Sequence, residues 1–158
     1  MLTSLIHWHW RRFPALGVDD LYDALALRSA VFSVEQGCAY LDPDGVDRHS
    51  SHLLGRVEAG VLQAYLRVVD PGVKYAEPSI GRVVTLSAVR GTGLGRRLFA
   101  EGVSRCTAAW PGQGIRISAQ AHLDGFYAGF GFGPVGQTYL EDNIPHLEML
   151  RPGGWAHT

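Results

Sequence analysis

Residues 89–98 read VRGTGLGRRL and place a glycine at every second position from 91 to 95. Glycine takes positive φ angles readily and lets a ligand approach the backbone closely. An apolar, β-branched run at 80–89 precedes these glycines and predicts a central strand, and the apolar positions from 98 to 106 repeat at helical spacing. A glycine-rich turn between a strand and a helix directs successive N–H groups at an anion. The stretch therefore predicts a phosphate-binding loop.

Two common phosphate-binding loops do not match this stretch. The dinucleotide pattern G-x-G-x-x-G fails because its sixth position is Arg96 or Leu98 in the two possible frames. The P-loop pattern fails because the chain contains no Lys-Ser or Lys-Thr pair. Glycines that serve only tight packing are the remaining alternative. Three alternating glycines with arginines on both sides favour an anion over that alternative.

Periodicity elsewhere in the chain predicts a single α/β domain with a mixed sheet. The expected elements are a strand at 5–10, a helix at 19–36, a hairpin at 52–69 that turns at 58–60, the strand at 80–89, the helix after the glycines, a strand at 114–122, a short helix at 123–132 and two strands around a turn at 141–144. The segments at 37–51 and 70–79 are rich in turn formers and predict loops. We expect the strand–helix–strand unit around the glycines to form a right-handed parallel crossover.

Composition limits the kind of protein. The chain has 158 residues, of which 46% are hydrophobic and 18% charged, so one domain with a sizeable core is expected over 1–158. Its formal net charge of −1 argues against a protein whose main function is to bind nucleic acid. We also see neither a signal peptide nor an apolar run of membrane-spanning length. Two widely separated cysteines, and histidine pairs without further ligands, predict no metal site and a location in the reducing cytoplasm.

Two motifs in a fixed order resemble those of a known enzyme family. The segment RGTGLG at 90–95 fits the pattern R-x-x-G-x-G, and FYAGFGF at 126–132 follows it after one helix and one strand. Together they resemble the GCN5-related N-acetyltransferase (GNAT) family. Five further stretches are similar to the ElaA-like branch of that family: LRSAVFSVEQ (27–36), CAY (38–40), IGRVV (80–84), AQAHL (119–123) and NIPHLEM (143–149). The chain departs from the common pattern at Gln120, where many members have Asn, and at Ser87, where Pro is common.

The resemblance implies a GNAT-like α/β fold, in which a mixed, mostly antiparallel sheet splays at a central parallel strand pair and is flanked by helices. It also implies transfer of an acetyl group from acetyl-CoA, the cosubstrate, to a primary amine by direct attack within a ternary complex. Backbone groups of the strand before the loop would hold the pantetheine arm, and the loop and helix N-terminus would hold the pyrophosphate. The implied acetyl-CoA-binding residues are Val83, Val84, Thr85, Arg90, Gly91, Thr92, Gly93, Leu94, Gly95, Arg96 and Gln120.

Such a transfer needs one group that donates a proton and one that accepts a proton. By resemblance, Tyr127 on the short helix is the general acid that protonates the departing CoA thiolate, although a core tyrosine could also serve only packing. The amine must lose a proton, and the sequence leaves the identity of this general base open. The candidates are Glu35, His122, Glu141 and His146, each of which also has an ordinary structural explanation.

Two other classes of function stay open on the sequence. The fold could hold acyl-CoA without catalysis, as a sensor or a partner protein, or the arginines around the glycines could contact nucleic acid, which the net charge disfavours. The acceptor is expected to be a small-molecule or peptide amine, and its identity depends on the segment at 37–51 and on the final hairpin. The sequence leaves the oligomeric state open: the apolar terminal strands could pair between two chains to form a homodimer. No membrane partner is expected.

Overall fold

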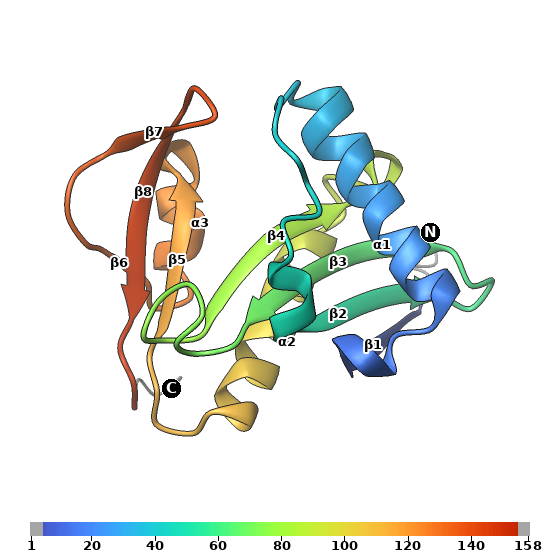
Figure 1. Cartoon of the computed structure of the whole chain (residues 1–158), viewed down its shortest axis with the longest axis horizontal. Helices are drawn as coiled ribbons and strands as arrows, with labels where there is room; N and C mark the ends of the chain where they lie inside the picture. The colour runs from blue at the N-terminus through green and yellow to red at the C-terminus, as the bar shows by residue number, and fades with distance from the viewer. Residues whose placement is uncertain (1–4, 155–158) are drawn as a thin grey trace.

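The computed structural model describes residues 5–154, in which two antiparallel sheets lie side by side (Figure 1). The first sheet has the strand order β1-β2-β3-β4, and these strands are Ile6–Arg12, Ser50–Val57, Leu62–Val69 and Ser79–Thr85. The second sheet has the order β5-β8-β6, with β7 also paired to β8, and the strands β5 to β8 are Ile115–Gln120, Gly133–Pro134, Tyr139–Glu141 and Ile144–Arg151. The outermost residues of the expected domain lie outside the described range.

The two sheets meet at β4 and β5, which run in the same general direction and then diverge (Figure 1). Near their beginnings the Arg116 N–H donates to the Pro78 carbonyl at 3.1 Å, whereas farther along each strand pairs only within its own sheet. The result is a wedge that opens toward the ends of both strands at Thr85 and Gln120. The predicted mixed, mostly antiparallel arrangement with a splayed central pair is confirmed.

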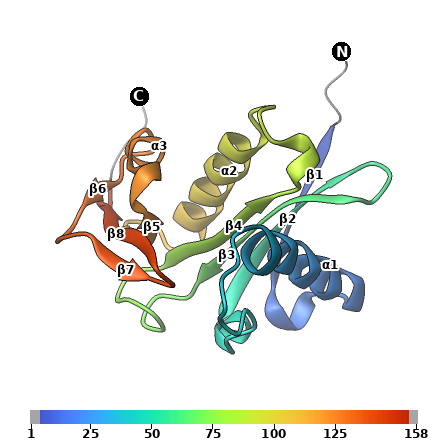
Figure 2. The same cartoon turned by 90° about the horizontal axis from the view of Figure 1, so that it is seen from above.

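Helices cover both faces of the first sheet (Figure 2). The helices are α1 (Val18–Arg28), α2 (Leu94–Ala109) and α3 (Asp124–Ala128). Because α1 and α2 lie on opposite faces, neighbouring residues of one strand enter different cores. Leu53 packs in the core that contains α2, and Leu54 packs in the core that contains α1. Burial on both faces explains why β3, LQAYLRVV, reads as a nearly continuous apolar run.

The segments with the clearest periodicity fold as predicted. The apolar stripe of α2 at 98, 99, 102, 103 and 106 is buried, and alternate residues of β5 point into the core. Both predicted hairpins are present. The second turns through Asp142 and Asn143, whose φ angles of 51° and 62° match a type I′ turn.

Two predicted strands end earlier than their sequence pattern indicates. The strand expected at 80–89 ends at Thr85, because Ser87–Val89 form a 3-10 turn that leads into the glycines. The strand expected at 114–122 ends at Gln120, where another 3-10 turn begins. In the first case the apolar run continues beyond the strand because Leu86 and Val89 still pack against the core, which a strand pattern does not distinguish from a ladder.

The predicted helix at 19–36 is present, but its second half is not an α-helix. The α-helix ends at Arg28 and continues as a π-helix over Ser29–Glu35, beyond which the Gln36 N–H donates to the Val31 carbonyl at 2.9 Å. A π-helix widens the turn and shifts which side chains share a face. Consequently Arg28 is buried at the junction, a position that the predicted stripe did not include. The expected loop at 37–51 likewise contains a 3-10 turn at Val46–His49 and the start of β2.

The short helix expected at 123–132 is also shorter than predicted, because α3 stops at Ala128. Among residues 5–154, no helix is long and apolar enough to cross a bilayer.

Candidate active site

A cavity of about 580 Å³ occupies the wedge between β4 and β5. The first strand contributes residues 79–83 to its wall, and the second contributes Ile117, Ser118 and Gln120. Tyr127 of α3 also lines it. The π-helix and the segment after it form one side wall, and the β7–β8 hairpin forms the opposite one. Splaying of the sheet therefore creates a site from parts of the chain that are far apart in sequence.

A β-bulge interrupts β4 inside this cavity. Along the β3–β4 ladder, Tyr65 pairs with Val84 and Arg67 pairs with Gly81, so β4 carries one extra residue between these pairs. The extra residue at 82–83 leaves backbone groups without ladder partners. Of the three residues expected to hold the pantetheine arm, Val83 lines the cavity, whereas the Val84 side chain is buried in the α1 core and Thr85 pairs with Ala64 of β3.

The glycine loop lies between β4 and α2. Gly91 and Gly93 have φ angles of 81° and 85°, which require glycine, whereas Gly95 lies in the first turn of α2. A Cβ at any of these three positions would meet no atom within 4 Å, so a ligand can approach the backbone. Among residues 5–154, no side chain caps α2, and the first turn of this helix carries no acidic residue. The free N–H groups at the start of this helix therefore favour an anion.

The arginines of the loop are held by other parts of the chain. Arg90 forms an ion pair with Glu35, whose Oε2 lies 2.6 Å from Nη1. Arg96 stacks on Phe126 and Phe130 of the α3 region, each 5.5 Å from the guanidinium. Thr92 closes the turn by donating its hydroxyl to the Val89 carbonyl at 2.6 Å. Glu35 is one of the four candidate bases. Its ion pair with Arg90 places it at the glycine loop, and it is not among the residues that line the cavity.

Tyr127 has the environment of a group that stays protonated. Its ring packs edge-on against Phe99 of α2 at 5.0 Å between centroids and against Phe132 at 6.4 Å. Burial raises the pKa of Tyr127 to about 12. Within residues 5–154 its hydroxyl has no hydrogen-bond partner, although the residue lines the cavity. The phenol is therefore a neutral donor available to a ligand.

Two of the other candidate bases meet in the cavity wall. His146 is buried, and its Nε2 lies 3.3 Å from Oε2 of Glu141 across the β7–β8 hairpin. The other ring nitrogen, Nδ1, donates to the Ile144 carbonyl at 2.7 Å, which fixes the proton on Nδ1 in a neutral ring. The ring also stacks on Tyr139, whose hydroxyl bonds to Ser118 of β5. Nε2 of His146 is thus the nitrogen that can accept a proton.

The remaining predicted residues divide between the cavity and the surface. Gln120 lines the cavity, and its amide donates at 3.4 Å to Oε1 of Gln36, which joins β5 to the end of the π-helix. His122 is exposed and is not part of the lining. The described part of the chain holds no group of three or more His, Cys, Asp or Glu side chains suited to a metal.

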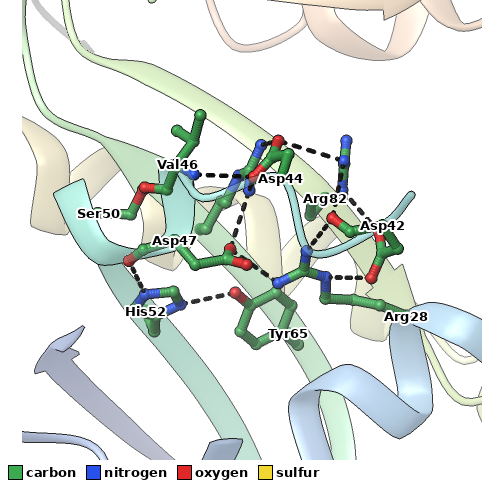
Figure 3. Close-up of polar contacts among 10 residues, drawn as sticks. Arg28, Asp42, Asp44, Val46, Asp47, Ser50, His52, Tyr65 and Arg82 are labelled. Carbon is green, nitrogen blue, oxygen red and sulfur yellow. Dashed lines mark hydrogen bonds and ion pairs between the residues drawn. The ribbon is translucent and has the colours of Figure 1, made fainter. Parts of the chain in front are cut away.

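Sequence reasoning missed a buried cluster of arginines and aspartates beside the cavity, shown in Figure 3. Arg28 is 1% exposed and contacts Asp47 at 2.8 Å and Asp42 at 2.9 Å. Asp47 also accepts a hydrogen bond from Arg67 at 2.9 Å. Nearby, His52 donates to the Asp47 carbonyl and accepts from Tyr65. A signal existed in the sequence, because DPDGVD at 42–47 concentrates three aspartates in one short loop.

Comparison with known proteins defines the class. The family model described as an acetyltransferase (GNAT) domain matches residues 47–151. The UPF0039 protein sll0451 of Synechocystis sp. is 46% identical over 145 residues, which cover 92% of this chain and 94% of that protein. The crystal structure of an acyl-CoA N-acyltransferase from Pseudomonas aeruginosa has a TM-score of 0.89 and 40% identity, covering 93% of this chain and 99% of that one.

These similarities show a GNAT acyltransferase domain, the class of protein that takes its acyl group from an acyl-CoA. Protein ElaA of Escherichia coli is 41% identical over 149 residues, covering 93% of this chain and 97% of that protein. The crystal structure of ElaA has a TM-score of 0.87 and covers 93% of this chain and 99% of that one. The chain belongs to the GNAT family and, within it, to the ElaA-like branch.

Proposed function

We propose that this chain is an N-acetyltransferase that moves the acetyl group of acetyl-CoA to a primary amine by direct attack in a ternary complex. The observation that carries the proposal is the placement of Tyr127. Its partly buried ring lines the same cavity as Val83, which lies at the bulge of β4. A donor thioester beside this bulge would bring its sulfur toward a neutral proton donor, as the reaction needs.

The glycine loop supports the choice of acetyl-CoA as donor. Its backbone approaches solvent without obstruction at Gly91, Gly93 and Gly95, and α2 begins there without a cap. A pyrophosphate at this point would accept hydrogen bonds from the free backbone N–H groups of residues 91–96. The pantetheine arm would then follow β4 into the wedge, with Val83 and Gln120 on either side.

The proposed chemistry assigns one role to each end of the cavity. The amine nitrogen attacks the thioester carbonyl, forms the C–N bond and breaks the C–S bond. The leaving thiolate takes the proton of Tyr127. The amine proton passes to Nε2 of His146, with Glu141 beside it, directly or through water. Of the four candidate bases, this pair is favoured because both residues line the cavity.

The acceptor is proposed to be a small-molecule or peptide amine that enters between the π-helix side and the β7–β8 hairpin.

The two cysteines, Cys38 and Cys106, are free, which supports a reducing, cytoplasmic location. A non-catalytic acyl-CoA sensor is the alternative that the test must separate.

The test is a calorimetric titration of the purified chain with acetyl-CoA, with NAD as the control ligand, followed by release of CoA from acetyl-CoA in the presence of a panel of amines. Binding of acetyl-CoA alone, with amine-dependent release of CoA, supports the enzyme. Binding without release for any amine supports the sensor. Failure of a folded sample to bind acetyl-CoA overturns both and returns the glycines to a packing role.

A further inference from the structure

The β-bulge in β4 carries a residue in an unfavourable conformation. Arg82 has a φ angle of 51°. This left-handed region suits glycine and, less well, asparagine or aspartate, because other side chains crowd the backbone there. Residues held in such conformations persist only where the surrounding structure fixes them, and they gather at functional sites. Arg82 lies at the point where β4 gains its extra residue, next to Val83 in the cavity wall.

The Arg82 side chain reaches out of β4 to the loop between the π-helix and β2 (Figure 3). Its Nε donates to Oδ1 of Asp42 at 2.9 Å, and its Nη2 donates to the Asp42 carbonyl at 3.3 Å. Nη2 also lies 3.5 Å from Oδ2 of Asp44. The guanidinium covers the ring of Tyr40 at 5.0 Å from the centroid. One side chain thus joins the bulge to three residues of the loop.

The two aspartates that hold Arg82 are themselves fixed. Asp42 is 4% exposed and lies 2.9 Å from Nε of Arg28, which also donates to its carbonyl. Asp44 receives two hydrogen bonds from Arg67, at 2.9 and 2.8 Å. Asp47 joins these two arginines to each other. Arg28, Arg67 and Arg82 thus form one connected frame of ion pairs with Asp42, Asp44 and Asp47, in which three positive and three negative charges balance. Arg82 is the member of this frame that belongs to the β4 bulge.

We propose that Arg82 is a positioning residue, which holds the β4 bulge in its strained conformation through Asp42 and Asp44 so that the backbone at Val83 stays open to the acyl donor. This inference rests on the proposed acetyl-CoA-binding function. At the bulge, residues 82 and 83 of β4 lack regular pairing with β3. The ion pairs of Arg82 hold these two residues in place of the missing strand pairing.

Paired substitutions separate backbone strain from loss of charge. Arg82→Gly and Arg82→Ala both remove the guanidinium, but only glycine accepts positive φ without crowding. We expect Arg82→Gly to bind acetyl-CoA at least about fivefold more tightly than Arg82→Ala, with the wild type tighter than both, since a left-handed conformation is that much costlier for alanine. Arg82→Asn should fall between them, because asparagine tolerates this region.

Arg116 supplies the matched control. It also makes ion pairs with two carboxylates, those of Glu77 and Glu148, and its side chain is 19% exposed, against 20% for Arg82. Arg116 lies in a regular part of β5, where glycine is the less favourable residue. We therefore expect the order of melting temperatures to be Ala above Gly at 116 and Gly above Ala at 82.

Binding is measured by calorimetry and melting by circular dichroism, so the inference can be tested even for variants that bind too weakly to titrate. Tighter binding and higher melting for Arg82→Gly than for Arg82→Ala supports the positioning role. The positioning role is overturned if alanine melts above glycine at 82 as it does at 116, or if the two variants at 82 bind acetyl-CoA equally well. Either result leaves the proposed function standing. A wild-type chain that does not bind acetyl-CoA overturns both.

Discussion

Glu35 and Arg90 form a two-point ion pair, with 2.6 Å between Oε2 and Nη1 and with Nη2 donating to Oε1 at 3.2 Å. The pair joins the end of the π-helix to the first residue of the R-x-x-G-x-G motif. It gives Glu35 a role at the phosphate loop that differs from the base role considered on the sequence. Both side chains are more than one-third exposed, so the pair is weak and can exchange with a stronger anion.

Glu35→Gln tests this relationship. Removing the carboxylate frees Arg90 for the pyrophosphate, so acetyl-CoA should bind up to about fivefold more tightly, the scale of an exposed ion pair. The turnover number should change little. Glu101→Gln is the control, because Glu101 pairs with Arg105 on the surface of α2. A loss of turnover by about a hundredfold with unchanged binding would instead assign Glu35 the base role.

Tyr127→Phe should lower the turnover number by about a hundredfold or more while leaving acetyl-CoA affinity unchanged, because it removes only the proton donor. Burial raises the pKa of Tyr127 to about 12, so the phenol stays protonated well above the usual range of tyrosine. The wild-type rate should therefore show no alkaline loss at the ordinary tyrosine pKa of about 10. Stopped-flow release of CoA across this range measures both effects. An unchanged turnover number in the phenylalanine variant would contradict the acid role.

A comparison of two histidines tests the base. His146 lines the cavity beside Glu141, whereas His122 is exposed and lies outside the lining. His146→Gln should lower the turnover number by about a hundredfold, the scale of general base catalysis, and His122→Gln should leave it unchanged. Steady-state rates with a turned-over amine give the comparison. Equal effects of the two substitutions would remove His146 from the mechanism.

The parts of this protein that sequence reasoning predicted are those set by local patterns. The positive φ angles at Gly91 and Gly93 and the buried stripe of α2 depend on neighbours along the chain. Arg28 shows the opposite case: its partners Asp42 and Asp47 lie 14 and 19 residues away, so a charged residue at a helix end gave no sign of burial. The positive φ of Arg82 likewise depends on contacts with Asp42, 40 residues away in the loop between the π-helix and β2. Motif order pointed to the glycine loop and to the segments around the cavity, but it gave no sign of the frame of arginines and aspartates beside them.

His52 predicts how stability depends on pH. Its Nδ1 accepts a hydrogen bond from Tyr65 at 2.7 Å and its Nε2 donates to the Asp47 carbonyl at 2.9 Å, an arrangement that satisfies the neutral ring. Burial lowers the pKa of His52, so the unfolded chain takes up a proton at a higher pH than the folded chain does. The free energy of unfolding should therefore fall as pH drops below about 6.5, by up to about 1.4 kcal/mol per pH unit.

Urea unfolding at about pH 7.5 and about pH 5.5 measures this dependence. His52→Gln should be less stable at the higher pH but should lose less on acidification, because the titrating group is gone. Ion pairs with Arg28 and Arg67 lower the pKa of Asp47, which moves its titration away from the pH window used. Despite burial, the hydrogen bonds and charge of Arg67 lower the pKa of Asp44 to about 2, so that group titrates far below the window used. An identical acid loss in the variant would show that another group controls it.

Lys74, the only lysine in the chain, lines the cavity and offers a direct probe of the region where we propose that the acceptor amine binds. Lys74 is exposed to solvent, but desolvation by the surrounding wall lowers the pKa of its ammonium; Glu141 partly offsets this, whereas the charges of Arg67 and Arg82 act in the same direction. A lower pKa leaves more neutral amine, so an amine-reactive acylating reagent should modify Lys74 at a lower pH than it modifies free lysine.

Amines that the protein turns over should slow this labelling of Lys74 by occupying the cavity. Peptide mass mapping separates Lys74 from the α-amino group, and Lys74→Arg should lose only the mapped adduct. Labelling at the pH of free lysine, without protection by any acceptor, would place the amine-binding region elsewhere.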